Sequence, residues 1–74
     1  GPGAFAAPMN GVIVKRMVEP GIAVTAGQAL MVMEAMKMEH SICAPAAGQV
    51  VEYFFDVGDQ VSGGDELLTF KIVD

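Results

Sequence analysis

The sequence predicts an all-β domain, and three observations carry this prediction. Short runs rich in aliphatic and β-branched residues alternate with glycine-containing turns, and no segment keeps a helical period. Two stretches of the chain also repeat each other: residues 7–34 align without a gap on residues 44–71, at a shift of 37, with eight identical positions. We therefore predict that each half folds as one copy of the same strand-and-turn unit.

The strands are expected between the turns of the two halves. Their lengths suit strands and are too short for helices. The six predicted strands lie at residues 12–18, 22–24, 29–33, 49–55, 60–61 and 66–73.

Matched glycines mark the turns between these strands. Gly21 aligns with Gly58, and Gly27 aligns with Gly64. Glycine takes a positive φ without steric cost, so matched glycines indicate that the same turns are made twice. Turn formation is a sufficient role for all four. No phosphate-binding loop is proposed, because neither glycine-rich nucleotide motif occurs.

Two sheets follow from the two halves. One four-stranded sheet from each half, with the apolar faces together, would give a flattened barrel-sandwich of two antiparallel sheets with an internal two-fold repeat. A chain of 74 residues supports one such domain, expected over residues 4–74. Residues 1–3, Gly-Pro-Gly, resemble a cleavage scar left by protein expression and are not expected to belong to the domain.

Composition narrows the classes of function. The net charge of −5 disfavours nucleic acid, whose binding depends on basic residues. No apolar run approaches the roughly 20 residues that span a bilayer, and no signal-peptide pattern opens the chain, so we expect no membrane partner. Cys43 is the single cysteine, which rules out an internal disulfide and is compatible with a reducing compartment.

The segment between the halves contains the most unusual residue. The tip 34–38, Glu-Ala-Met-Lys-Met, is predicted as a tight hairpin between a strand ending near Met33 and another starting near Met38. The shift of 37 maps Lys37 onto Asp74 at the end of the chain. Lys37 is therefore expected at one pole of the domain.

The motif EAMKM, on a hairpin between two glycine-punctuated repeats, resembles the biotinyl domain, or biotin carboxyl carrier domain, of biotin-dependent carboxylases. The resemblance covers almost the whole chain, and the gap-free repeat leaves no room for the protruding thumb of some bacterial carriers. It implies that Lys37 carries covalent biotin on its ε-nitrogen. It also implies that Glu34, Ala35, Met36 and Met38 are the flanks that are recognised.

The resemblance further implies a set of partners. A biotin protein ligase attaches biotin, a biotin carboxylase uses ATP and bicarbonate to load it, and a carboxyltransferase domain or subunit unloads it. The isolated domain is then a non-catalytic carrier of an acyl-CoA carboxylase, of methylcrotonoyl-, geranyl- or propionyl-CoA type. Pyruvate and urea carboxylases remain alternative parents. The implied location is the cytoplasm, which is favoured, or the mitochondrial matrix.

Lysine chemistry agrees with a separate ligase. The amine of a free lysine is protonated at neutral pH and needs a base before it can attack. Glu34 and Glu39 would stabilise the ammonium if they lie close, which opposes spontaneous attack. The hairpin is thus expected to be a substrate that a ligase activates.

The sequence is also compatible with other functions. Lipoyl domains share the fold, but their tip usually reads Asp-Lys-Ala, which this chain lacks. Thioethers and an imidazole suit Cu(I), so a copper-binding module is a second hypothesis. A catalytic base at His40 has no nucleophile partner, because Ser41 and Cys43 fit ordinary strand positions. The copper hypothesis would use Met31, Met33, Met36, Met38 and His40.

Overall fold

A computed structural model describes residues 4–73, which form eight strands and no helix. The all-β prediction is therefore confirmed, while the predicted scar at residues 1–3 lies outside the described residues. Within residues 4–73, no helix has the length and apolarity needed to cross a membrane. The strands are β1 (Ala4–Ala6), β2 (Gly11–Arg16), β3 (Ala23–Val24), β4 (Ala29–Ala35), β5 (Met38–Cys43), β6 (Gly48–Tyr53), β7 (Gln60–Val61) and β8 (Glu66–Ile72).

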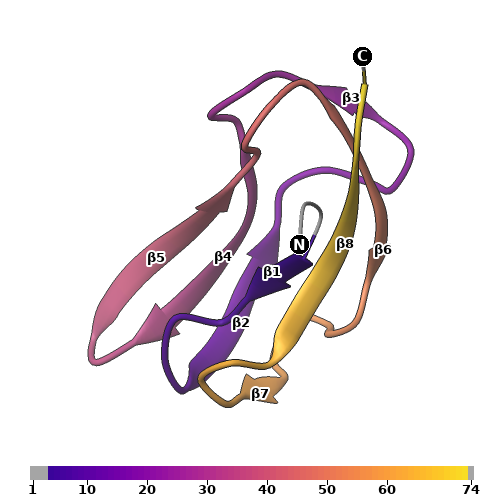
Figure 1. Ribbon diagram of the computed structural model, residues 1–74. Helices are drawn as coiled ribbons and strands as arrows, with labels where there is room; N and C mark the ends of the chain where they lie inside the picture. The colour runs from indigo at the N-terminus through magenta and orange to yellow at the C-terminus, as the bar shows by residue number, and fades with distance from the viewer. Residues whose placement is uncertain (1–3, 74) are drawn as a thin grey trace.

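The strands form two four-stranded antiparallel sheets, as predicted, with the orders β1-β8-β6-β3 and β5-β4-β2-β7 (Figure 1). The expectation of one sheet from each half was wrong, because the halves exchange their two-residue strands: β3 pairs with β6, and β7 pairs with β2. Hydrogen bonds at the turns explain the exchange. The Gly21 N–H donates to the Val50 carbonyl of β6 (2.9 Å). This hydrogen bond holds the turn before β3 against β6, in the second half.

Strand ends differ from the prediction by one or two residues at most positions. The difference that matters most is at β4, which runs to Ala35 and so reduces the hairpin tip to two residues. Strand β1 was missed. It has only three residues, too few for a recognisable strand pattern, and it is a strand because it pairs with β8.

The internal two-fold repeat is confirmed by strands and by hydrogen bonds. The shift of 37 carries β2, β3 and β4 onto β6, β7 and β8 with the same bounds. The Gly27 N–H donates to the Ala44 carbonyl at 2.8 Å, and its counterpart, the Gly64 N–H, donates to the Ala7 carbonyl at 2.8 Å. The two halves therefore hold each other with the same bonds.

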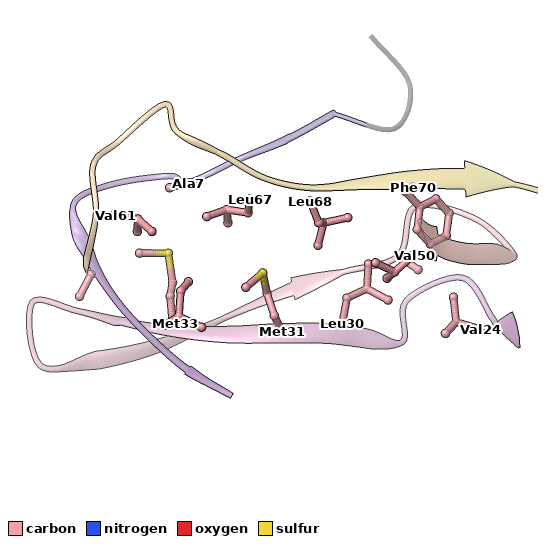
Figure 2. Packing of buried hydrophobic residues seen from close by; sticks show 13 residues of the cluster. Ala7, Val24, Leu30, Met31, Met33, Val50, Val61, Leu67, Leu68 and Phe70 are labelled. Atoms are coloured by element: carbon pink, nitrogen blue, oxygen red, sulfur yellow. The ribbon is translucent and has the colours of Figure 1, made fainter. Parts of the chain in front are cut away.

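The hydrophobic core follows the same two-fold repeat as the strands. It lies between the two sheets, where residues of β4 face residues of β8 (Figure 2). Removing these side chains from water is the main stabilising contribution to the fold. Equivalent buried pairs are Ala7 with Ala44, Ile13 with Val50, Val24 with Val61, Leu30 with Leu67, Met31 with Leu68 and Met33 with Phe70.

Arg16 and Tyr53 occupy equivalent positions of the repeat and contact each other, which places this pair near the two-fold axis. The Arg16 guanidinium carbon lies 5.1 Å from the centre of the Tyr53 ring. The same guanidinium forms an ion pair with Asp56 at 3.1 Å. The Tyr53 hydroxyl donates towards the backbone carbonyls of Val18 (2.8 Å) and Leu30 (2.9 Å), so it ties the β2–β3 connection to β4.

The Tyr53 hydroxyl gives the first prediction. Tyr53→Phe is expected to lower the free energy of unfolding by about 1 kcal/mol, because a partly buried hydrogen bond is lost. Burial raises the pKa of Tyr53 above 10.0, so the unfolded chain ionises first. Stability should therefore fall as the pH rises from about 10 through the higher pKa of the folded state. Urea unfolding at several pH values would measure both effects, and the absorbance of this single tyrosine would report its ionisation.

An unchanged unfolding midpoint in Tyr53→Phe would contradict this role. So would an alkaline loss of stability that is the same in the wild type and the variant.

Candidate functional site

The hairpin between β4 and β5 ends in a two-residue turn made of Met36 and Lys37. Both residues have positive φ, 53° for Met36 and 64° for Lys37. A two-residue turn with positive φ at both positions is of type I′, whose twist matches that of the flanking strands. The hairpin projects at one end of the molecule, away from the end of β8 (Figure 1).

This turn is conformationally strained. Type I′ turns favour Asn-Gly, and a residue with a Cβ pays roughly 1–2 kcal/mol in the left-handed region. The β4–β5 pairing imposes the geometry, because Ala35 pairs with Met38 and Glu34 pairs with Glu39. An observed outlier of this kind, held by a regular ladder, is typical of functional positions.

Met36→Asn tests the strain. Asparagine tolerates positive φ better than methionine does, and Met36 loses little packing because its side chain is 85% exposed. We expect the variant to gain roughly 0.5–1 kcal/mol in free energy of unfolding. Denaturant melts of both proteins would measure the difference. Val57→Asn, at another exposed apolar residue, is the control and should bring no such gain.

The hairpin brings together all five residues that the sequence singled out. Lys37 and Glu34 are exposed, Met36 and Met38 are 85% and 63% exposed, and Ala35 is buried at 4%. Ala35 thus anchors the hairpin to the core, while its four neighbours face outward. Within residues 4–73, no carboxylate lies within 4.0 Å of the Lys37 ammonium.

The charges around the tip are mostly negative. Glu34 and Glu39 lie directly opposite each other on the two strands, and both are exposed. Like charges across a strand pair repel each other mildly, and a cation at the tip offsets that repulsion. In the described part of the chain, no group of three histidine, cysteine or acidic side chains gathers around this amine. The hairpin presents an accessible amine rather than a catalytic cluster.

The methionines of the copper hypothesis do not converge. Met31 and Met33 are fully buried in the core, while Met36 and Met38 stand exposed at the tip. His40, Ser41 and Cys43 occupy β5, the edge strand of its sheet. The five proposed copper ligands are therefore divided between the interior and the surface.

Sequence reasoning missed the backbone geometry of the tip. It placed the tip at residues 34–38, whereas the turn in the structure has only two residues, both with positive φ. The spacing between Ala35 and Met38 would have revealed this only if the end of β4 had been known. Neither Met nor Lys signals a left-handed turn.

Comparisons with known proteins find relatives among biotin-dependent carboxylases and their carrier proteins. The family model described as "Biotin-requiring enzyme" matches residues 3–70. The chain is 44% identical over 70 residues to the mitochondrial methylcrotonoyl-CoA carboxylase subunit alpha of Arabidopsis thaliana, a match that covers 95% of this chain and 10% of that protein. The chain thus spans about a tenth of this relative.

Two further matches are to a carrier protein of similar length and to a large multi-domain carboxylase. The biotin carboxyl carrier protein of acetyl-CoA carboxylase from Solanum lycopersicum is 45% identical over 69 residues, covering 93% of this chain and 99% of that protein. A solved structure of a single-chain, multi-domain long-chain acyl-CoA carboxylase superposes with a TM-score of 0.86 and 37% identity, covering 100% of this chain and 8% of that one.

Proposed function

This chain belongs to the family of biotin-requiring enzymes, as a biotin carboxyl carrier domain, and from that premise we propose that Lys37 is the residue that carries its biotin. The observation that supports the assignment is the hairpin itself. Lys37 occupies the second position of a strained type I′ turn at one end of the molecule, with its amine exposed. The other two lysines lie in strands: Lys15 in β2 and Lys71 in β8.

The residues at the tip fit covalent attachment of biotin. Attachment needs an amine that a ligase can surround, and a two-residue turn exposes Lys37 from several sides. The flanks Glu34, Ala35, Met36 and Met38 would give the ligase its recognition surface, and Ala35 fixes the hairpin because it is buried. The Lys37 nitrogen would lose a proton and displace AMP from biotinyl-adenylate to form the amide.

The rest of the domain serves to deliver the carried carboxyl group. When bound, biotin supplies the atom that accepts and releases a carboxyl group. The rigid double sheet holds the attachment point, and the lysine stem with the biotin side chain makes an arm of about 14 Å by extended-chain reckoning. Tethering keeps the carried group near its acceptor sites at an effective concentration in the millimolar range.

The parent enzyme is part of the same proposal. We assign the domain to an acyl-CoA carboxylase, of methylcrotonoyl-CoA type by the similarity to the plant subunit. Its partners would be a biotin carboxylase, a carboxyltransferase and a biotin protein ligase. The cytoplasm is our favoured location, with mitochondria as the alternative that the plant relative's name supports.

Attachment can be tested by mass. Incubation with a biotin protein ligase, ATP and biotin should add one biotinyl group to the chain, at Lys37 and at neither Lys15 nor Lys71. Intact mass and peptide mapping would measure this, with Lys37→Ala as the control that gains nothing. An unchanged mass for the wild type, or biotin on Lys37→Ala, would refute the assignment. A lipoyl increment with a lipoate ligase in its place would favour a lipoyl carrier.

A further inference from the structure

A groove lies on the same sheet as the tip, between the first residues of β2 and the strand β7. Its apolar surface comes from the half-buried Val12, while Val61 lies beneath it in the core, and its polar groups come from three exposed side chains. The groove is lined by Asn10, Gly11, Val12, Gln60, Val61 and Ser62.

The polar side chains of the groove are available to a ligand. The Asn10 Oδ1 accepts a hydrogen bond from the Gly63 N–H at 2.7 Å, which fixes the amide, and its NH₂ group makes no hydrogen bond within the described residues. Within the described part of the chain, the Gln60 side chain makes no hydrogen bond. The groove therefore offers two side-chain amides beside an apolar surface.

The internal repeat shows that the fold does not require these amides. The shift of 37 relates Asn10 to Ala47 and Gln60 to Ala23 at the opposite end of the domain. The backbone at the two ends is the same, since β3 and β7 have equivalent bounds and pairings. At the opposite end alanines replace both Asn10 and Gln60, and the one strand amide there, Gln49, stands where Val12 stands in the groove, so this pair of amides beside a valine is particular to the end that carries Lys37.

The groove is within reach of the tip. Val12 pairs with Glu34 on one side and with Gln60 on the other, so these three side chains form one row across the sheet, directly below the turn. Neighbouring strands lie about 4.8 Å apart, which puts β7 about 10 Å across the sheet from β4. An arm of about 14 Å on Lys37 is long enough to enter it.

We propose that this groove is a resting site for the head group of biotinyl-Lys37, an inference that rests on the proposed function. The head group is a cyclic urea fused to an apolar sulfur ring, with two N–H donors and a carbonyl acceptor. Side-chain amides match the urea, and Val12 matches the ring. Because a tethered head is present at roughly millimolar effective concentration, millimolar affinity is enough to fill the site about half of the time.

Nuclear magnetic resonance can detect this contact without any assay of activity. Spectra of the unmodified and biotinylated chains are compared after intact mass has verified attachment. We expect shift changes at the side-chain amides of Asn10 and Gln60, separate from those at residues 34–39. Proton contacts between the sulfur ring and the Val12 methyls should also appear.

Matched variants give the test its controls. Gln60→Ala, which installs the residue of the other half, should remove the contacts to Val12. Asn10→Asp keeps the acceptor for Gly63 but removes the donor, and it should weaken them. Gln49→Ala changes a strand glutamine at the opposite end and should leave them intact.

The outcomes separate the two proposals. A biotinylated chain whose shift changes are confined to residues 34–39 would overturn the resting site and leave the carrier function standing. Contacts that persist in both Gln60→Ala and Asn10→Asp would also overturn it. A chain that gains no biotin by mass would refute the carrier function, and the resting site with it.

Discussion

Replacing Lys37 with arginine is expected to abolish all incorporation of label from bicarbonate into this domain. Arginine keeps the positive charge and much of the length, but its guanidinium is effectively always protonated and offers no amine for a biotinyl amide. Wild type and variant are treated with biotin protein ligase, then with a biotin carboxylase, ATP and labelled bicarbonate. Label bound to protein is counted, and only the wild type should carry it.

The chain supplies its own control for this experiment. Lys71→Arg makes the same exchange on β8, at the repeat position equivalent to Glu34, and should label like the wild type. Label on Lys37→Arg would contradict the assignment. Hydrolysis of ATP by the purified domain alone would contradict its role as a carrier.

A methyl group at Gly11 or at Gly48 should be the most damaging small change to the fold. A Cβ on Gly11 would overlap the Glu34 carbonyl oxygen and lie 2.7 Å from the end of Met33. A Cβ on Gly48 would overlap the Lys71 carbonyl oxygen and lie 2.8 Å from the Phe70 ring. Because backbone cannot yield as a side chain can, we expect Gly11→Ala and Gly48→Ala each to lose about 3 kcal/mol.

That loss is large for a small domain, whose whole stability is of the order of 0.1 kcal/mol per residue. Urea unfolding monitored by circular dichroism would measure it. Gly21→Ala and Gly58→Ala are the controls: both have positive φ, 89° and 95°, but open space around the added Cβ. They should lose about 1 kcal/mol each, and by similar amounts. Equal losses at all four glycines would contradict the steric argument.

The candidate site was predictable in its residues but not in its shape. Lys37 and its flanks stand out in the sequence because the motif falls between two matched halves. The positive φ of Met36 and Lys37 could not be predicted from the sequence, because neither residue type favours it and the strand pairing imposes it. The groove beside Asn10 and Gln60 was missed because its two sides are 50 residues apart in the chain.

The sequence by itself determined the strand class, the turns and the repeat. Glycine positions fix where the chain can turn, and the pattern of aliphatic residues fixes the strands, because both depend on local backbone and side-chain preferences. Equivalent core pairs such as Ile13 with Val50 follow from the same pattern.

Only the tertiary structure decided which strands pair. The strands β3 and β7 have only two residues each, so their local sequence hardly favours one pairing partner over another. Hydrogen bonds from the Gly21 and Gly58 N–H groups to carbonyls of the opposite half place each of them beside a strand of that half. Those bonds join residues 29 and 45 positions apart along the chain. Contacts at such separations depend on how whole sheets pack, and the local preferences of the residues do not predict them.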